Sequence, residues 1–174
     1  MEKITLQEKL RYEILRNGFQ GENMKKDICL ISSSGGHWEQ LKRLSFLEEE
    51  YNCIWITEKI KSMSTDRKVK YLVQQDRKKW YLIFLLLYNS LKSLYFLLKY
   101  RPAVIISTGA GVVIPFCILG KILGVKIVFI ESFAKKNSPT KTGTIIYKIS
   151  NKFYVQWPEM KKYYPEAEYK GAIY

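Results

Sequence analysis

Short apolar runs alternate with longer stretches that have the length and spacing of helices along most of the chain. The runs are bounded by glycine, proline or polar residues, which is typical of strands buried on both faces. We expect six strands, at residues 28–31, 53–57, 69–73, 103–106, 125–130 and 153–155. Strands that alternate with helices form parallel sheets covered on both sides. The pattern therefore predicts an α/β fold with a doubly wound, Rossmann-like parallel sheet.

Two of the expected strands end in glycine-containing turns that precede helices. The first turn, residues 32–36, leads into His37, the only histidine of the chain. The second turn, residues 107–111, leads into a helix expected over residues 112–123. Glycine lets a bound group approach the backbone, and helix-opening N–H groups favour anions. Ligands of such sheets bind beyond the carboxyl ends of the strands, so we expect a site formed by these turns and the loop 131–139.

The glycine turns do not match the common nucleotide-binding or hydrolase motifs. GxGxxG is absent, so a dinucleotide site with Glu58 at the ribose is the weaker interpretation. No Walker lysine follows either turn, and no GxSxG elbow is present. His37 is either a general base or a structural, hydrogen-bonded residue. Glu131 either binds a ligand, or it satisfies loop N–H groups or pairs with Lys135. Lys135 either contacts a phosphate or is solvated.

The most apolar stretch, residues 80–100, is expected to form a helix. Lys92 lies in its middle, which argues against a membrane-spanning segment, and basic residues flank it. We expect a helix half-embedded in a bilayer surface; the alternative is a helix buried in the core. The expected membrane contacts are Trp80, Phe84, Leu87, Leu91 and Phe96, with Lys79, Lys99 and Arg101 at the headgroups.

Length and charge narrow the class of protein further. The 174 residues suit one domain, expected over residues 24–174, with residues 1–23 either an added amphipathic arm or a helix covering the core. The net charge of +13 implies an acidic partner, but no nucleic-acid-binding motif is present, so we expect a membrane surface and no nucleic acid. The three cysteines lie in apolar elements without metal-ligand spacing and are expected as reduced core thiols in a cytosolic setting.

Several segments together resemble one family, in the same order. They are SSSGGHWEQL, RPAVIISTGAGVVIPF, KIVFIESFAKKNSPTKTG, KFYVQWPEM and YYPEAEYKG. The family is that of the membrane-associated, acceptor-binding subunit of the two-component dolichol-linked N-acetylglucosaminyltransferase, with its bacterial relatives in capsule and exopolysaccharide synthesis. The resemblance covers residues 26–171. The same layout resembles the N-terminal half of the lipid-linked GlcNAc transferase of peptidoglycan synthesis, a GT-B enzyme.

The resemblance implies a fold and an activity. The chain would be the N-terminal-type, acceptor-binding domain of a GT-B glycosyltransferase, and a separate small subunit would bind the UDP-sugar donor. Together they would form an inverting transferase that adds the second sugar to a polyprenyl-pyrophosphate-linked monosaccharide, and this chain would be inactive alone. It would lie peripherally on the cytoplasmic face of the cell membrane. We expect no cofactor on this chain and no catalytic metal, since Asp-x-Asp is absent.

The resemblance also implies roles for single residues. His37 would be the base that deprotonates the acceptor hydroxyl. We expect acceptor and phosphate binding at Ser34, Gly35, Gly36, Thr108, Gly109, Gly111, Glu131, Ser132 and Lys135. Two other functions remain open: a non-catalytic membrane scaffold that activates a complete partner glycosyltransferase, and a free-standing nucleotide-binding enzyme.

Overall fold

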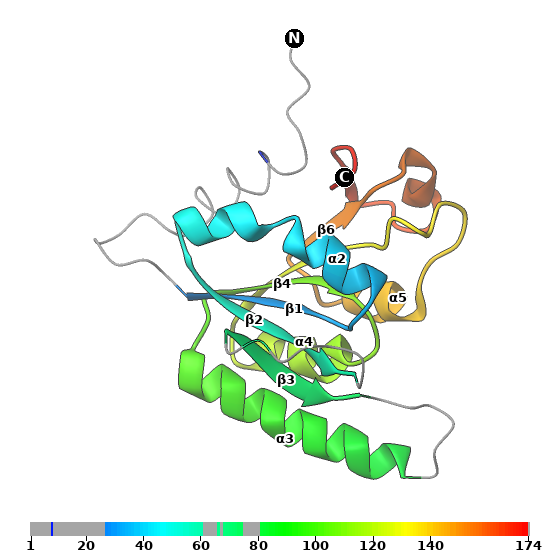
Figure 1. Ribbon diagram of the computed structural model, residues 1–174. Coiled ribbons are helices and arrows are strands. Elements are labelled where there is room, and N and C mark those ends of the chain that lie inside the picture. Colours follow the sequence, from blue (N-terminus) through cyan, green and yellow to red (C-terminus); the bar gives the residue numbers. More distant parts are fainter. Residues whose placement is uncertain (1–7, 9–26, 61–65, 67, 75–80, 174) are drawn as a thin grey trace.

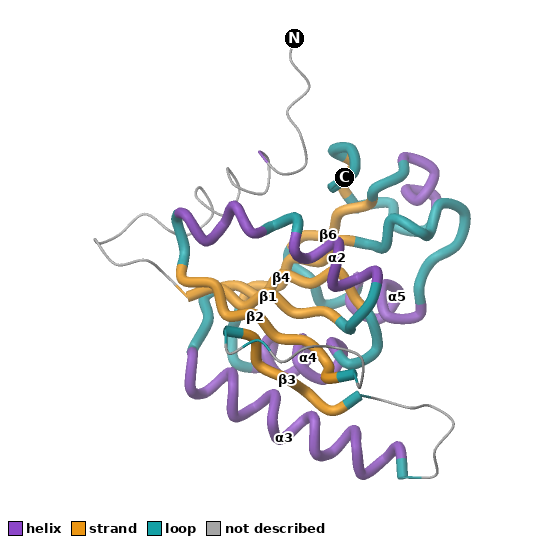
Figure 2. The backbone as a smooth tube through the Cα atoms, in the orientation of Figure 1, coloured by secondary structure: helices purple, strands orange, loops and turns teal. Residues whose placement is uncertain are grey.

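The computed structural model describes residues 8, 27–60, 66, 68–74 and 81–173, and shows one parallel sheet with helices on both faces (Figures 1 and 2). The strands are β1 (Asp27–Ser32), β2 (Asn52–Lys59), β3 (Val69–Val73), β4 (Val104–Gly109), β5 (Lys126–Ile130), β6 (Lys152–Val155) and β7 (Glu168–Tyr169). The α-helices are α2 (Gly36–Lys42), α3 (Leu82–Tyr100), α4 (Val113–Ile122) and α5 (Lys141–Tyr147), and the 3₁₀ helices are η1 (Ser45–Glu49) and η2 (Pro158–Lys162). The predicted Rossmann-like fold is confirmed.

The strands lie in the order β3-β2-β1-β4-β5-β6-β7, and every neighbouring pair is parallel. The chain runs outward in one direction from β1 to β3, then returns to the other side of β1 and continues outward to β7. The direction therefore reverses between β1 and β4. In open parallel sheets, the carboxyl ends of the two strands at such a reversal border the ligand-binding region. The two glycine turns follow these two strands.

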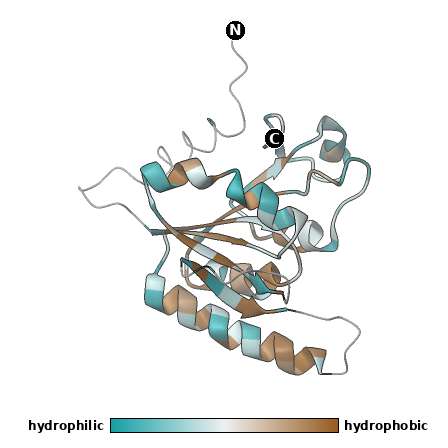
Figure 3. Cartoon of the chain, in the orientation of Figure 1, coloured by the Kyte–Doolittle hydropathy of each residue, from teal (hydrophilic) through white to brown (hydrophobic). Residues whose placement is uncertain are grey.

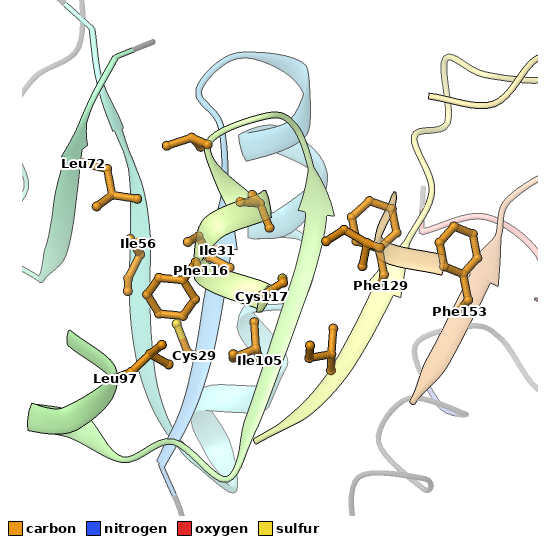
Figure 4. Close-up of a cluster of buried hydrophobic side chains, with 14 of the residues drawn as sticks. Cys29, Ile31, Ile56, Leu72, Leu97, Ile105, Phe116, Cys117, Phe129 and Phe153 are labelled. Atoms are coloured by element: carbon orange, nitrogen blue, oxygen red, sulfur yellow. The ribbon is translucent and has the colours of Figure 1, made fainter. Parts of the chain in front are cut away.

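Two layers of apolar side chains hold the helices on the sheet. On one face, α3, α4 and α5 pack against the sheet; Figure 4 shows Leu97, Phe116 and Cys117 lying against side chains from the strands. On the other face, Trp38 and Leu41 of α2 and residues of η1 cover the sheet. Strands buried on both faces must be apolar throughout, which is why they read as continuous apolar runs in the sequence.

The three cysteines are free thiols in these elements, as predicted. Cys29 and Cys117 are buried, and burial raises the pKa of both thiols. They therefore stay protonated and unreactive at neutral pH.

Some boundaries differ from those expected. The helix expected over residues 112–123 is α4, Val113–Ile122, and the strand expected at 103–106 is β4, which extends to Gly109. The segment after the first glycine turn forms the short helix α2 and then the 3₁₀ helix η1. Residues 1–7 and 9–23 of the expected N-terminal arm, together with Lys79 and Trp80, lie outside the described residues.

The helix α3 faces the protein with two of its polar residues, Asn89 and Ser93, a placement that the sequence did not predict. Asn89 is fully buried, and its side chain bonds both backbone groups of Val73: Oδ1 accepts from N–H at 2.9 Å and Nδ2 donates to the carbonyl at 2.8 Å. Ser93 is also buried and donates to the Asn89 carbonyl. Phe96 lies in the core at 7% exposure, so its assignment as a membrane contact is wrong. Asn89 thereby satisfies the end of the edge strand β3, and α3 is fixed against it.

The contact between α4 and β4 depends on a glycine. A Cβ atom at Gly120 would overlap the Cδ1 atom of Ile105, a fully buried side chain. We predict that Gly120→Ala lowers the free energy of unfolding by about 1–3 kcal/mol, because the helix must move away from the sheet to admit the methyl group. Urea denaturation measures this loss. The matched control is Gly36→Ala, where a Cβ atom meets no atom of the described residues within 4 Å; equal losses in both variants would contradict the prediction.

Candidate functional site

The two glycine turns meet at the carboxyl ends of β1 and β4. The backbone N–H of Ser33 donates to the Gly109 carbonyl at 2.8 Å. The strand register shifts here: Ile31 is opposite Ser107, and Ser32 is opposite Gly109. Thr108 is therefore the extra residue of a β-bulge, and its carbonyl is not used in the ladder between the two strands. The bulge leaves this carbonyl available to another partner.

That partner is His37, in the first turn of α2. Its Nδ1 lies 2.6 Å from the Thr108 carbonyl oxygen, and the Thr108 hydroxyl donates to the His37 carbonyl at 2.7 Å. A carbonyl oxygen only accepts hydrogen bonds, so Nδ1 carries the proton and Nε2 keeps its lone pair in the neutral ring. No hydrogen bond from the described residues engages Nε2, and the side chain is half-buried. The imidazole is thus oriented with its basic nitrogen unused.

Gly109 makes room for this ring. A Cβ atom there would lie 3.1 Å from Cε1 and 3.2 Å from Nδ1 of His37, and the φ angle of Gly109 is +100°. The Gly109 N–H is bonded to the Ser107 hydroxyl at 3.1 Å. Thr108 and Gly109 therefore position His37, and the Thr108 hydroxyl and carbonyl and the Gly109 N–H and carbonyl are already engaged. Their expected role in direct phosphate binding does not fit these bonds.

The first turn is open. Gly35 and Gly36 are exposed; among the described residues, a Cβ atom at either would meet nothing within 4 Å, and no side chain caps the start of α2. The Ser34 hydroxyl is half-buried and lies 3.4 Å from Oε1 of Glu58. Gly111, in the second turn, is half-buried, and its carbonyl accepts the N–H of Ile114. The structure thus brings Ser34, Gly35 and Gly36 together with His37 and leaves their backbone accessible.

Glu131, at the end of β5, is the largest departure from the expected site. Its carboxylate is 1% exposed and accepts hydrogen bonds from the Ser132 N–H at 2.8 Å and the Tyr164 hydroxyl at 2.7 Å. It also accepts from the N–H and the hydroxyl of Thr140, at 3.0–3.3 Å. The assignment of Glu131 to acceptor or phosphate binding is therefore wrong. Its carboxylate closes the loop 131–140, which is the structural alternative raised from the sequence.

The same carboxylate sits at the start of α5. The Thr140 hydroxyl accepts the Gly143 N–H at 2.7 Å and caps the helix. A Cβ atom at Gly143 would overlap the Glu131 carboxylate and lie 2.6 Å from the Tyr164 hydroxyl oxygen. Burial, followed by the bond to Glu131, raises the pKa of Tyr164, so its hydroxyl remains a donor. The residues Glu131, Thr140, Gly143 and Tyr164 thus form one buried polar cluster, called here the Glu131 cluster.

A buried glutamine connects the Glu131 cluster to the helix of His37. Gln156 Nε2 donates to the Glu131 carbonyl at 2.8 Å and to Oε1 of Gln40 at 3.2 Å. Its Oε1 accepts the N–H of Ile173 at 3.0 Å. Gln40 and Gln156 are 4% and 2% exposed, so these bonds are not replaced by water. The sequence reasoning missed this pair; the available signal was an amide side chain beside apolar neighbours in each of two motif segments.

The outer side of the loop 131–140 packs against η2. The Trp157 indole N–H donates to the Phe133 carbonyl at 2.7 Å. Lys136 lies 4.9 Å from the Trp157 ring centroid and 3.4 Å from the Glu159 carboxylate. Ser132 is buried and Lys135 is half-buried. Within the described ranges, no group of three His, Cys, Asp or Glu side chains is arranged to hold a metal ion.

The sequence of this chain is similar to that of a known protein family. The family described as "Oligosaccharide biosynthesis protein Alg14 like" matches residues 28–173. The chain belongs to the Alg14-like family. It is 27% identical over 177 aligned positions to the Homo sapiens UDP-N-acetylglucosamine transferase subunit ALG14, an alignment that covers 84% of this chain and 82% of the relative. It is 38% identical over 93 positions to the Candida albicans subunit, covering 50% of this chain and 42% of the relative.

Solved structures support the fold of this Alg14-like chain. Acinetobacter baumannii MurG matches with a TM-score of 0.64 at 13% identity, over 84% of this chain and 45% of MurG. A UDP-N-acetylglucosamine 2-epimerase from Rickettsia bellii matches with a TM-score of 0.65 at 13% identity, over 86% of this chain and 46% of the epimerase. The chain thus spans less than half the length of these proteins. The predicted fold class, a doubly wound, Rossmann-like parallel sheet like that in about half of each of these proteins, is confirmed.

The Glu131 cluster makes a prediction about stability. Tyr164→Phe removes one of the donors to the buried carboxylate, and we expect it to lower the free energy of unfolding by about 1.5–3 kcal/mol, the range for hydrogen bonds to charged groups. Urea denaturation at neutral pH measures the change. The control is Glu159→Gln, an exposed carboxylate paired with Lys136, where we expect little change. An unchanged midpoint for Tyr164→Phe would show that the cluster does not anchor the loop.

Proposed function

We propose that this chain is the acceptor-binding subunit of a bipartite glycosyltransferase that works at a membrane. A second, donor-binding subunit would supply a UDP-sugar, and the acceptor would be a monosaccharide linked to a polyprenyl pyrophosphate. Membership of the Alg14-like family supports the transferase role, since its curated relatives are named as UDP-N-acetylglucosamine transferase subunits. The name of these relatives as subunits supports a partner chain.

The observation that carries the proposal is the oriented imidazole of His37. Its Nδ1 is held by the Thr108 carbonyl, so its Nε2 is left as a proton acceptor. In the proposed step, the acceptor hydroxyl oxygen attacks the anomeric carbon of the donor sugar and forms the new glycosidic C–O bond. The bond from that carbon to the phosphate oxygen breaks, and UDP leaves with its electron pair. Nε2 takes the hydroxyl proton, and attack opposite the leaving group inverts the anomeric carbon.

The acceptor pyrophosphate would lie against the first turn. Accessible backbone at Gly35 and Gly36, together with the hydroxyl of Ser34, offers donors to phosphate oxygens. Gly111, Ser132 and Lys135 would complete the pyrophosphate site from the neighbouring loops. Thr108 and Gly109 act through His37, and Glu131 is excluded because its carboxylate is buried. The pathway would be capsule, exopolysaccharide or lipid-linked oligosaccharide synthesis, on the cytoplasmic face of the membrane.

The test is His37→Ala and His37→Gln in the chain co-expressed with its donor-binding subunit. With a polyprenyl-pyrophosphate monosaccharide and UDP-N-acetylglucosamine, we expect kcat to fall by about 10²–10⁴-fold in both variants, because neither side chain accepts the proton. The matched control is Glu39→Gln, an exposed change on the same helix, which should keep the wild-type rate. Thermal melting and co-purification confirm that each complex is intact.

Two results would redirect the proposal. Wild-type turnover by the His37→Ala complex would remove the assignment of the base and favour a scaffold that activates a complete partner enzyme. Transfer by this chain alone, without any partner, would remove the bipartite arrangement. The second result also tests the free-standing enzyme considered from the sequence.

A further inference from the structure

The outward side of α3 is apolar over its whole length. Phe84, Leu87, Leu91 and Leu98 are 67%, 59%, 68% and 54% exposed. The buried side of the same helix carries the polar Asn89 and Ser93. Figure 3 shows α3 as a largely hydrophobic helix on the outside of the molecule. A surface helix normally shows the reverse arrangement, so this face calls for an apolar partner.

The neighbouring helix α4 continues this apolar face. Ile118 and Ile122 are spaced as i and i+4, so they lie on one side of α4, where they are 41% and 74% exposed; Leu123, just after the helix, is 45% exposed. The two helices are neighbours on the same face of the sheet (Figure 1). Both follow a strand and lead to the next parallel strand, so they run in the same direction. The sequence predicted a membrane contact for residues 80–100 only.

One edge of α3 carries two tyrosine–lysine pairs. Lys92 lies 5.8 Å from the ring centroid of Tyr88, and Lys99 lies 5.5 Å from that of Tyr95. The two pairs repeat after seven residues, so they lie on the same edge of the helix. Tyrosine and lysine are the side chains that place an apolar body in lipid and a polar end among the headgroups.

The charge of this region is of one sign. Residues 77–130 contain eight lysines and arginines and no aspartate or glutamate. A protein partner could match the apolar face, but α3 and α4 carry Lys92, Lys99 and Lys121 and no acidic side chain, and such a surface is complementary to a sheet of phosphates. Apolar side chains at the centre with basic and tyrosine side chains at the edge match the profile of a bilayer from its acyl chains to its headgroups.

We propose that the outward sides of α3 and α4 together form a surface that lies flat on an anionic phospholipid bilayer. Ile118, Ile122 and Leu123 enter the acyl region beside the leucines of α3, and the tyrosine–lysine edge meets the headgroup phosphates. The inference rests on the proposed location at a membrane, and it assigns the surface that makes the contact.

The alternative, that α3 crosses the bilayer, conflicts with its contacts. By length and composition α3 is apolar enough to span. However, Asn89 bonds both backbone groups of Val73, and Phe96 and Leu97 belong to the core. A spanning helix would lose these contacts and bury an unpaired amide in lipid. An in-plane helix keeps them.

The candidate site lies at the edge of the sheet where α3 begins. Because α3 follows β3, its first turns lie on the side of the sheet where the parallel strands end. The turns that carry His37 and Gly35 are at this same carboxyl edge. The first turns of α3 and the turn at Gly35 therefore lie at the same edge of the sheet, while α2 itself covers the face opposite α3.

Vesicle binding of the full chain tests the surface without donor, acceptor or partner. We expect Ile118→Glu/Ile122→Glu to weaken binding to phosphatidylglycerol-containing vesicles by about tenfold or more, because two apolar contacts are lost and two negative charges are added. Leu87→Glu/Leu91→Glu should do the same. The control is Tyr169→Glu, an exposed position on β7 at the far edge of the sheet, which should bind as wild type. Wild-type binding by the α4 variant would overturn the proposal.

A second measurement reads the contact directly. Ile122→Cys and Tyr169→Cys, each labelled with bimane in a Cys53→Ser background, are bound to vesicles with brominated acyl chains. Quenching at 122 and none at 169 is expected. A water-exposed label at 122 in vesicle-bound protein would overturn the proposal. So would a wild-type chain that is a dimer in solution and an Ile118→Glu/Ile122→Glu variant that is a monomer but binds vesicles as wild type does, because the apolar face would then be a dimer interface. Loss of transferase activity in His37→Ala with normal vesicle binding would separate failure of the catalytic step from failure of docking.

Discussion

The buried carboxylate of Glu131 is the constraint on which the carboxyl edge of the sheet depends. A desolvated carboxylate is strongly unfavourable unless donors surround it, and here the donors come from Ser132, Thr140 and Tyr164. These residues belong to the start of the loop, the cap of α5 and the segment after η2. The need to satisfy one carboxylate therefore fixes three segments relative to one another. Through its carbonyl and Gln156, the same residue also reaches α2, the helix that carries His37.

This arrangement explains why some predictions from the sequence succeeded. Strands buried on both faces need apolar side chains at every position, so the runs from 28–31 to 153–155 were recognisable without any partner in view. The glycine turns after β1 and β4 were also predictable, because the order of elements brings the ends of parallel strands to one edge. In both cases the information is local in the chain or follows from the topology.

The direction in which a side chain points could not be predicted in the same way. A glutamate at the end of a strand has the same sequence whether it faces a ligand or a loop, and only the positions of Thr140 and Tyr164 turn Glu131 inward. Likewise, the helical spacing of Asn89 and Ser93 defines a polar stripe but not the side on which it lies. The backbone groups of Val73, at the outer edge of β3, decide on which side the stripe lies, because they are the partners of Asn89. The exposed apolar face of α4 could not be predicted for the same reason, since its residues fit a buried helix equally well.

The position of His37 depends on an irregularity that no motif records. In a regular ladder between β1 and β4, the carbonyl of Thr108 would point in the plane of the sheet toward a neighbouring strand and would not be free for the His37 side chain. The register shift between Ile31 and Ser32 instead frees this carbonyl, which then holds Nδ1 of the imidazole. Gly109 is required next to it because any Cβ atom would press on the ring. The bulge at Thr108 and the space at Gly109 thus act together on His37, and they set the tautomer that leaves Nε2 able to accept a proton.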